Sequence, residues 1–228
     1  MQRFAFHAPV TFFVGENGTG KSTLLEALAV CCGFNAEGGT RNFNFSTNET
    51  HSSLYKNMKI SRSIPFPHDG FFLRAESYYN VATEVEQLKE SGLDDGSGFM
   101  RHYGGKSLHQ QSHGESFLSL VMNRFQGGSI FFLDEPEAAL SPSRQFALLA
   151  RIHELVGMGC QFIIATHSPI LIACPESEVY VLSEEGVELT SYQETEHFSL
   201  MKHFLNNPEH TLHYLLAKVE GPWASGGW

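Results

Sequence analysis

The sequence contains no apolar run long enough to cross a membrane. A transmembrane helix needs roughly 18 or more consecutive apolar residues, and the opening MQRFAFHAPV is too polar for a secretory signal. Cysteine is also scarce, with 4 among 228 residues and none in a C-x-x-C pair. We therefore expect a cytoplasmic protein with reduced, mostly buried thiols, and not a disulfide scaffold.

Basic residues are fewer than acidic ones. The chain has 15 Lys and Arg against 25 Asp and Glu, which gives a formal net charge of −10. This balance disfavours broad electrostatic binding to nucleic acid, although it leaves room for a local basic face. Heptads and internal repeats are absent as well, so a long coiled coil is not expected.

Short apolar segments alternate with segments of helical pattern. The patterns predict strands at 10–14, 71–77, 130–133 and 162–165, then a hairpin of 179–182 with 187–190. They predict helices at 21–32, 78–90 and 115–125, one opening at Ser141-Pro142, and helical structure over 194–218 broken near Pro208. This alternation indicates an α/β fold: a mostly parallel sheet covered by helices on both faces.

The segment GENGTGKST lies between the first predicted strand and the first predicted helix. It fits G-x-x-x-x-G-K-[ST], the P-loop or Walker A pattern. Glycines let the backbone wrap a polyphosphate, and successive N–H groups make an anion-binding nest at a helix N-terminus. Lys21 is expected to reach the β- and γ-phosphates, and the Ser22 hydroxyl to ligate Mg²⁺. The predicted nucleotide-binding residues are Gly15, Glu16, Asn17, Gly18, Thr19, Gly20, Lys21, Ser22 and Thr23.

An acidic pair follows another predicted buried strand, in the stretch IFFLDEP. Ligands of open parallel sheets bind at the carboxyl ends of strands, which would place Asp134 beside Mg²⁺. Glu135 would then orient and deprotonate the attacking water. Taken alone, both acids could simply cap the next segment; together with the P-loop they favour the catalytic interpretation.

A histidine ends a third apolar strand, in the stretch QFIIATHSP. His167 should therefore lie at the same sheet edge and could bond the γ-phosphate. The alternative is a hydrogen-bonded loop residue without a role in chemistry.

The order of these motifs along the chain resembles that of the ABC-type ATPases: the P-loop comes first, then Ser112-His113-Gly114-Glu115, Asp134-Glu135 and His167. The short QSHGES resembles the signature of the non-transporter branch, which includes SMC-like and recombination ATPases. DEPEAALSP resembles small bacterial predicted AAA/ABC-type ATPases. The resemblance implies a single P-loop NTPase domain over 1–228 that binds ATP and Mg²⁺ and hydrolyses ATP. A helical and signature subdomain would be inserted at about 34–125, and a flexible tail would follow at about 219–228.

The resemblance also implies a head-to-tail homodimer that closes on ATP. Ser112, Gly114 and Glu115 would complete the site of the partner, although Ser112 could merely cap the following helix. Residues 139–141 would lie at the dimer seam. Where the family usually has a glutamine near Mg²⁺, the stretch FLRAES offers Glu76.

Other functions fit parts of the pattern. The alternatives are a nucleotide-binding subunit of a membrane transporter, a slow DNA-associated ATP switch and an NTP-dependent kinase. A zinc site is disfavoured, because the terminal histidines have no paired cysteine. Those histidines are His197, His203, His210 and His213. Arg41 and Arg74 could support phosphate or acidic partners, although solvated positions are the default expectation for both.

Overall fold

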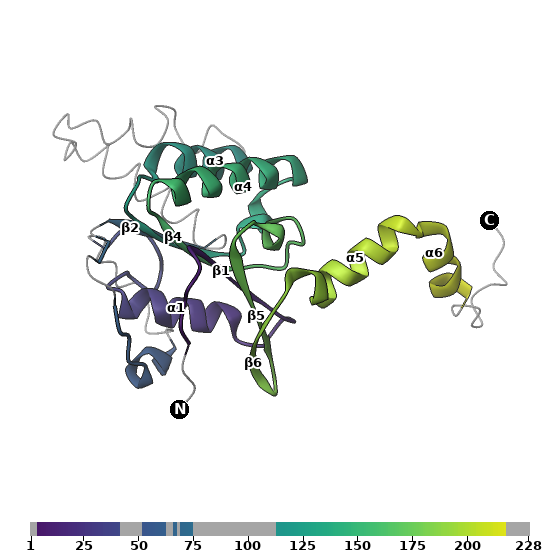
Figure 1. Cartoon of the computed structure of the whole chain (residues 1–228), viewed down its shortest axis with the longest axis horizontal. Helices are drawn as coiled ribbons and strands as arrows, with labels where there is room; N and C mark the ends of the chain where they lie inside the picture. Colours follow the sequence, from purple (N-terminus) through teal and green to yellow (C-terminus); the bar gives the residue numbers. More distant parts are fainter. Residues whose placement is uncertain (1–3, 42–51, 63–65, 68, 75–112, 218–228) are drawn as a thin grey trace.

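The structure is a computed structural model that describes residues 4–41, 52–62, 66–67, 69–74 and 113–217. These residues form a sheet of six strands flanked by helices (Figure 1). The strands are β1 (Val10–Val14), β2 (Gly70–Arg74), β3 (Ile130–Asp134), β4 (Gln161–Ala165), β5 (Ser177–Ser183) and β6 (Gly186–Thr190). The α-helices are α1 (Lys21–Cys31), α3 (His113–Arg124), α4 (Pro142–Gly157), α5 (Glu196–Asn206) and α6 (Pro208–Ala217). Short 3₁₀ turns are η1 (Ser53–Asn57), η4 (Pro136–Ala139), η5 (Leu171–Ala173) and η6 (Tyr192–Glu194).

The strand order is β2-β3-β4-β1-β5-β6. All neighbouring strands run parallel except β5 and β6, which form an antiparallel hairpin. The register aligns Asp134 of β3 with both Arg74 of β2 and Ala165 of β4, and Phe13 of β1 also with Ala165. The chain therefore leaves β1, β2, β3 and β4 at one edge of the sheet, where parallel sheets bind ligands.

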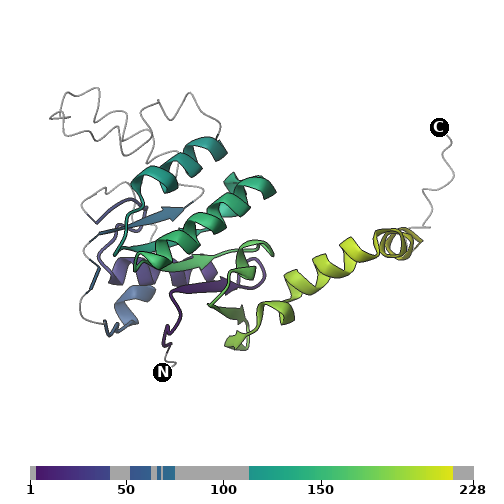
Figure 2. The ribbon, with the colours of Figure 1, turned by 45° about the horizontal axis from the view of Figure 1, so that its top comes forward.

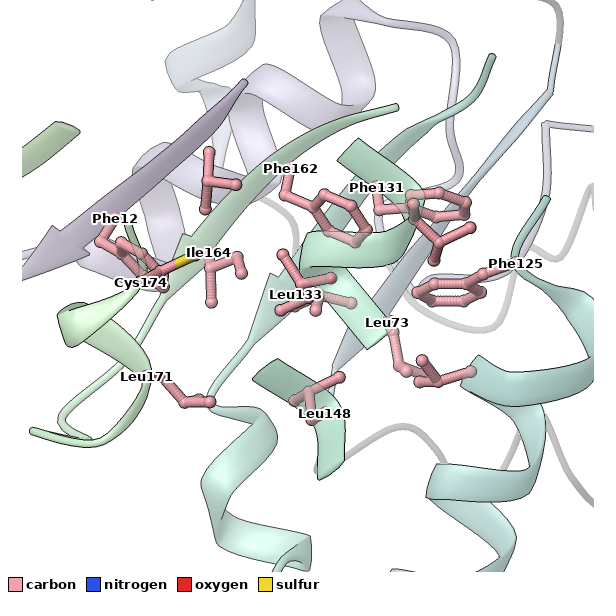
Figure 3. Close-up of a cluster of buried hydrophobic side chains, with 14 of the residues drawn as sticks. Phe12, Leu73, Phe125, Phe131, Leu133, Leu148, Phe162, Ile164, Leu171 and Cys174 are labelled. Carbon is pink, nitrogen blue, oxygen red and sulfur yellow. The ribbon is translucent and has the colours of Figure 1, made fainter. Parts of the chain in front are cut away.

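Both faces of the central strands are buried, which explains their continuous apolar sequences. Phe12 and Phe131 point into a core beneath α3 and α4, whereas the next residues along each strand, Phe13 and Phe132, point into a second core with α1. Phe125 stacks on Phe131 with ring centroids 4.0 Å apart (Figure 3). Helices on both faces thus hold the sheet rigid beneath the edge that carries the polar side chains.

Helices α5 and α6 project away from the sheet in both views (Figure 1 and Figure 2). Only the start of α5 lies near the sheet edge, next to the hairpin of β5 and β6. The large apolar side chains exposed on these two helices are Leu200, Met201, Leu205, Leu212, Tyr214, Leu215 and Leu216.

The predicted fold class is confirmed, because the sheet is mostly parallel and flanked by helices. The predicted strand 10–14 matches β1, the hairpin matches β5 with β6, and the C-terminal helices break at Pro208. The helix predicted from Glu115 begins two residues earlier, at His113. Ser141 occupies the N-cap position of α4, but its hydroxyl makes no capping hydrogen bond. The predicted helix 78–90, most of the proposed insertion and the tail lie outside the described residues.

Candidate nucleotide-binding site

The P-loop connects the buried end of β1 to the first turn of α1. The φ angles of Gly15, Gly18 and Gly20 are 144°, 86° and 88°. Residues other than glycine rarely adopt this region. A Cβ on Gly15 would lie 2.3 Å from the carbonyl oxygen of Leu182. The first glycine is therefore required both by its backbone angle and by the close approach of β5.

Several amide groups of this loop point at no protein acceptor. Within the part of the chain that the structure describes, the N–H groups of Gly18, Gly20, Lys21 and Ser22 donate no hydrogen bond. Three of them lie at the start of α1, where the helix dipole adds partial positive charge. Such a set of free donors fits the oxygens of a phosphate chain.

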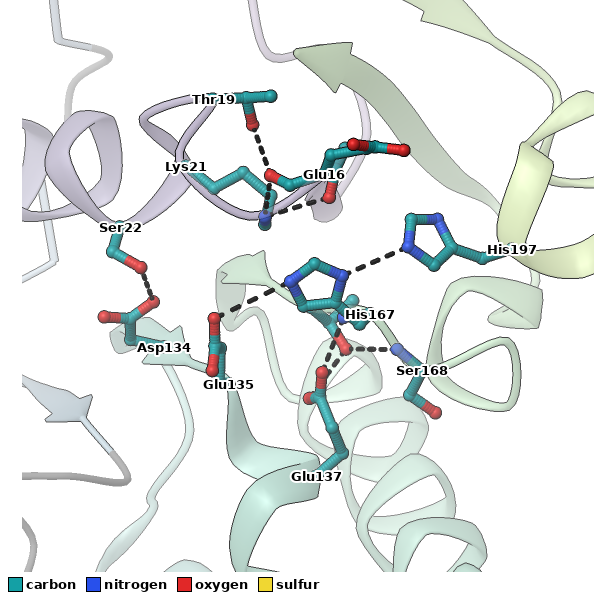
Figure 4. A network of polar contacts seen from close by, with 12 residues as sticks. Glu16, Thr19, Lys21, Ser22, Asp134, Glu135, Glu137, His167, Ser168 and His197 are labelled. Carbon is teal, nitrogen blue, oxygen red and sulfur yellow. Dashed lines mark hydrogen bonds and ion pairs between the residues drawn. The ribbon is translucent and has the colours of Figure 1, made fainter. Parts of the chain in front are cut away.

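Lys21 folds back over the loop. Its Nζ donates to the carbonyl oxygens of Gly15 and Glu16, both at 2.9 Å, and the residue is only 4 % exposed (Figure 4). Burial lowers the pKa of Lys21, while the carboxylates of Glu135 and Asp134 oppose that shift. A buried ammonium beside two neutral carbonyl oxygens is poised to move to a stronger anionic acceptor.

Ser22 and Asp134 meet across the gap between α1 and β3. The Ser22 hydroxyl donates to Oδ1 of Asp134 at 2.8 Å. A hydroxyl and a carboxylate oxygen in contact are ligands of the kind that Mg²⁺ prefers. The residues therefore fit the metal role predicted for them, and this pair is where the ion would be held.

Arg74 lies on the other side of Asp134. Its Nε is 3.5 Å from Oδ2 of Asp134, and its Nη1 donates to Oε2 of Glu26 at 2.9 Å. The side chain is 22 % exposed, so the expectation of a solvated Arg74 is wrong. Arg41 is not solvated either, because it donates to the carbonyl of Pro67 and packs over Phe34 and Phe66. Both guanidinium groups are partly buried by packing between elements that local sequence does not reveal.

Glu135 follows Asp134 and turns out of the sheet. Its backbone is left-handed, with φ 49° and ψ 51°, which is uncommon for a residue with a side chain. Its N–H donates to the carbonyl of Ala165, and its carboxylate is 41 % exposed. The unusual turn holds a solvent-accessible carboxylate beside Lys21, and strained positions of this kind cluster at functional sites.

His167 reaches the same place from the end of β4. Its Nε2 lies 3.7 Å from Oε1 of Glu135, and its backbone N–H donates to Oε1 of Glu137. Glu137 also accepts from the Thr166 hydroxyl, which ties the loop after β4 to the turn after β3. Burial lowers the pKa of His167, and the charges of Lys21 and His197 lower it further, whereas the carboxylate of Glu135 opposes the shift. Its imidazole is therefore neutral at physiological pH.

Sequence reasoning missed Glu137 and His197 as members of this site, and it gave the contact of Arg74 with acidic partners only as an alternative to solvation. Glu137 was visible as the third acid of DEPEAAL, two residues after Glu135. His197 gave no signal, because it lies 30 residues beyond the histidine whose Nδ1 it contacts at 3.1 Å.

A cleft of about 450 Å³ runs along the outer side of the P-loop. Residues 14–19 form one wall, residues 181–184 a second, and residues 195–197 at the start of α5 a third. Asp134 and Glu135 are not among the described residues that line it. The volume is within the usual range for small-ligand sites, roughly 300–1,000 Å³.

The signature segment is described only from its second residue. Ser112 lies outside the described residues, as does Glu76. Gly114 packs directly against the turn after the acidic pair, because a Cβ there would lie 2.5 Å from the carbonyl oxygen of Ala139. Glu115 pairs with Arg144 of α4, with Oε1 and Nη2 3.0 Å apart.

Replacing Gly114 by alanine should destabilise the protein by about 1–3 kcal/mol, the usual cost of overpacking. The new methyl group would collide with backbone that cannot easily move. Gly157→Ala, at the end of α4, is the matched control, because nothing lies within 4 Å of its Cβ position. That variant should be neutral or gain up to about 1 kcal/mol. Urea unfolding measures both, and equal stability of the two variants would contradict this packing.

The loop, the acidic pair and the sheet order together define a P-loop nucleotide-binding domain. Comparisons with known proteins agree. A family model described as "AAA domain" matches residues 2–98, and one described as "AAA domain, putative AbiEii toxin, Type IV TA system" matches residues 109–173. The chain is therefore similar to AAA-type ATPase domains over these two segments, each of which is less than half of its length.

Curated relatives are longer proteins. The chain is 27 % identical over 176 residues to ABC transporter G family member STR2 of Medicago truncatula, covering 70 % of this chain and 24 % of that protein. It is 25 % identical over 195 residues to the macrolide export ATP-binding/permease protein MacB of Shigella flexneri, covering 76 % and 28 %. The chain thus spans about a quarter of the length of these relatives.

Among solved structures, cbiO1 of Clostridium perfringens, part of the ABC transporter complex cbiONQ, has a similar fold. The TM-score is 0.50 at 19 % identity, and the match covers 94 % of this chain and 90 % of that one. The likeness concerns the fold alone. Among the described residues, no helix is both long and apolar enough to cross a bilayer.

Proposed function

We propose that this domain binds ATP with Mg²⁺ and hydrolyses it to ADP and phosphate. One observation carries the proposal: polar side chains from three separate strand ends converge on one space (Figure 4). They are Lys21 and Ser22 after β1, Asp134 and Glu135 at the end of β3, and His167 after β4. Structural ion pairs alone would not require free loop amides, a left-handed Glu135 and a buried ammonium at the same edge.

The phosphate chain would lie along the P-loop. The free amides of Gly18, Gly20, Lys21 and Ser22 and the ammonium of Lys21 would bind its oxygens. Lys21 would then exchange the carbonyls of Gly15 and Glu16 for phosphate. Thr19 and the exposed Glu16, Asn17 and Thr23 border this path. The ribose and base would occupy the cleft between the loop and the start of α5.

Ser22 and Asp134 would hold Mg²⁺, which neutralises charge on the phosphates when it is bound. Glu135 would accept a proton from the water that attacks the γ-phosphorus, and its exposure leaves room for that water. His167 would donate from Nε2 to a γ-phosphate oxygen. The bond between the γ-phosphorus and the oxygen of ADP then breaks, and ADP and inorganic phosphate are the products.

The closed form would be a head-to-tail homodimer in which Ser112, Gly114 and Glu115 complete the site of the partner. The support is the resemblance of the segment around Ser112 to the ABC-type signature; Gly114 itself is buried against the turn after Glu135 in its own chain. This arrangement would let ATP binding and hydrolysis close and open the dimer.

Ser112→Arg tests the dimer. The bulky cation should block closure, so that ATP-dependent dimerisation and turnover are lost while ATP still binds the monomer. Ser53→Arg, at an exposed serine of η1, introduces the same side chain elsewhere and should leave both intact. Mass in solution with and without ATP, together with phosphate release, provides the readout. Loss of ATP binding itself in Ser112→Arg would show that this segment does not act across a dimer.

A second candidate function is supported by the relatives. The two curated relatives named above carry names of transport or export proteins. The domain could therefore supply energy from ATP hydrolysis to a membrane transport protein. Stoichiometric co-purification of the domain with a membrane protein would favour this function. If the domain is not found in detergent-solubilised membranes, this function is disfavoured.

A further inference from the structure

The imidazole rings of His167 and His197 are in contact. Nδ1 of His167 lies 3.1 Å from Nε2 of His197, and the ring centroids are 5.1 Å apart (Figure 4). His167 follows β4, whereas His197 lies in the first turn of α5. A residue from the C-terminal helices therefore contacts the histidine that is the candidate ligand of the γ-phosphate.

The position of His197 is fixed by its surroundings. Thr195, which is buried, caps α5 by accepting from the N–H of Phe198. Phe198 packs edge-on against Tyr192 with ring centroids 5.1 Å apart, and both rings border the core under α4. His197 is thus held by a capped helix start and is not a free surface side chain.

The neighbours of His167 decide which ring nitrogen carries the proton. A neutral imidazole has one N–H and one acceptor nitrogen, and the bond made by one nitrogen sets the state of the other. The Nε2 of His167 makes no hydrogen bond within the described residues, and it faces a carboxylate oxygen of Glu135 at 3.7 Å, whose negative charge favours a proton on Nε2. The Nδ1 must then accept, and the nearby Nε2–H of His197 is the donor.

We propose that His197 is a positioning residue that holds His167 in the Nε2–H tautomer and aims this N–H at the γ-phosphate position. The inference rests on the proposed function for its consequence in catalysis, because only a phosphate oxygen needs a donor there. In the opposite tautomer, Nε2 would present a lone pair and repel the phosphate.

The tautomer can be measured without nucleotide. Long-range ¹H–¹⁵N correlation spectra of labelled protein distinguish a protonated from an unprotonated ring nitrogen at His167. We expect protonated Nε2 and unprotonated Nδ1 in the wild type, and a mixture of tautomers in His197→Ala. His197→Gln, whose amide nitrogen can donate from a similar place, should restore the wild-type spectrum. An unchanged His167 tautomer in His197→Ala would overturn the proposal.

Turnover gives the second readout. ATP hydrolysis should fall by about ten- to a hundredfold in His197→Ala, the range seen when the partner that orients a metal-ligating histidine is removed. It should largely recover in His197→Gln. His203→Ala, on the exposed side of the same helix, is the control and should match the wild type. If the wild type does not hydrolyse ATP, the proposed function fails, while the spectra still decide the role of His197. Full turnover in a folded His197→Ala would contradict the positioning role.

Discussion

Lys21→Met is expected to weaken ATP binding by at least about a hundredfold. The ammonium would make two or more charge-assisted hydrogen bonds to phosphate, each typically about 1.5–3 kcal/mol, and about 1.4 kcal/mol is a factor of ten in affinity. Methionine keeps most of the buried aliphatic chain, so the packing under the loop is preserved. Isothermal titration with Mg²⁺ and ATP measures the change.

The matched control is Lys59→Met, because Lys59 is exposed and lies away from the loop. That variant should bind ATP as the wild type does. Thermal unfolding without nucleotide separates loss of binding from loss of fold. Wild-type affinity in a folded Lys21→Met protein would mean that the glycine loop does not bind the phosphates.

Glu135→Gln should abolish turnover while leaving ATP bound. Removing a general base typically lowers the rate by about 10²- to 10⁴-fold, and glutamine keeps the size and left-handed turn of this residue. Because opening of the dimer would follow hydrolysis, we expect this variant to accumulate as an ATP-bound dimer. Phosphate release and light scattering on the same sample give both readouts.

Glu188→Gln provides the control, since Glu188 is an exposed carboxylate on β6. It should hydrolyse ATP at the wild-type rate and remain in the wild-type equilibrium between monomer and dimer. Undiminished hydrolysis in Glu135→Gln would remove Glu135 from the chemistry and leave another group to accept the proton.

Much of the fold was predictable because its signals are local. The apolar runs at Val10–Val14 and Ile130–Asp134 are buried on both faces, so their sequences alone indicate central strands. The first leads into the glycine loop and the second ends at Asp134, and both places must lie at the carboxyl edge of a parallel sheet. The neighbourhood of the P-loop, Asp134 and His167 follows from that rule without any knowledge of side-chain packing.

The rest of the site depends on contacts between distant segments. The pairing of Arg74 with Glu26 and Asp134 requires β2 to lie beside β3, a strand order that periodicity does not determine. His197 reaches His167 only because the chain returns to the carboxyl ends of the strands after the hairpin of β5 and β6, where α5 begins beside the P-loop. Neither residue belongs to a recognisable sequence pattern.

The central claim is that ATP phosphates lie on the free amides at the start of α1 and in the loop before it, with Mg²⁺ held by Ser22 and Asp134. The most direct test is an experimental structure of Glu135→Gln crystallised with Mg²⁺ and ATP. We expect Lys21 Nζ on phosphate oxygens, Mg²⁺ between Ser22 and Asp134, and His167 Nε2 facing the γ-phosphate. Nucleotide bound elsewhere, with Lys21 still on the carbonyls of Gly15 and Glu16, would contradict the account.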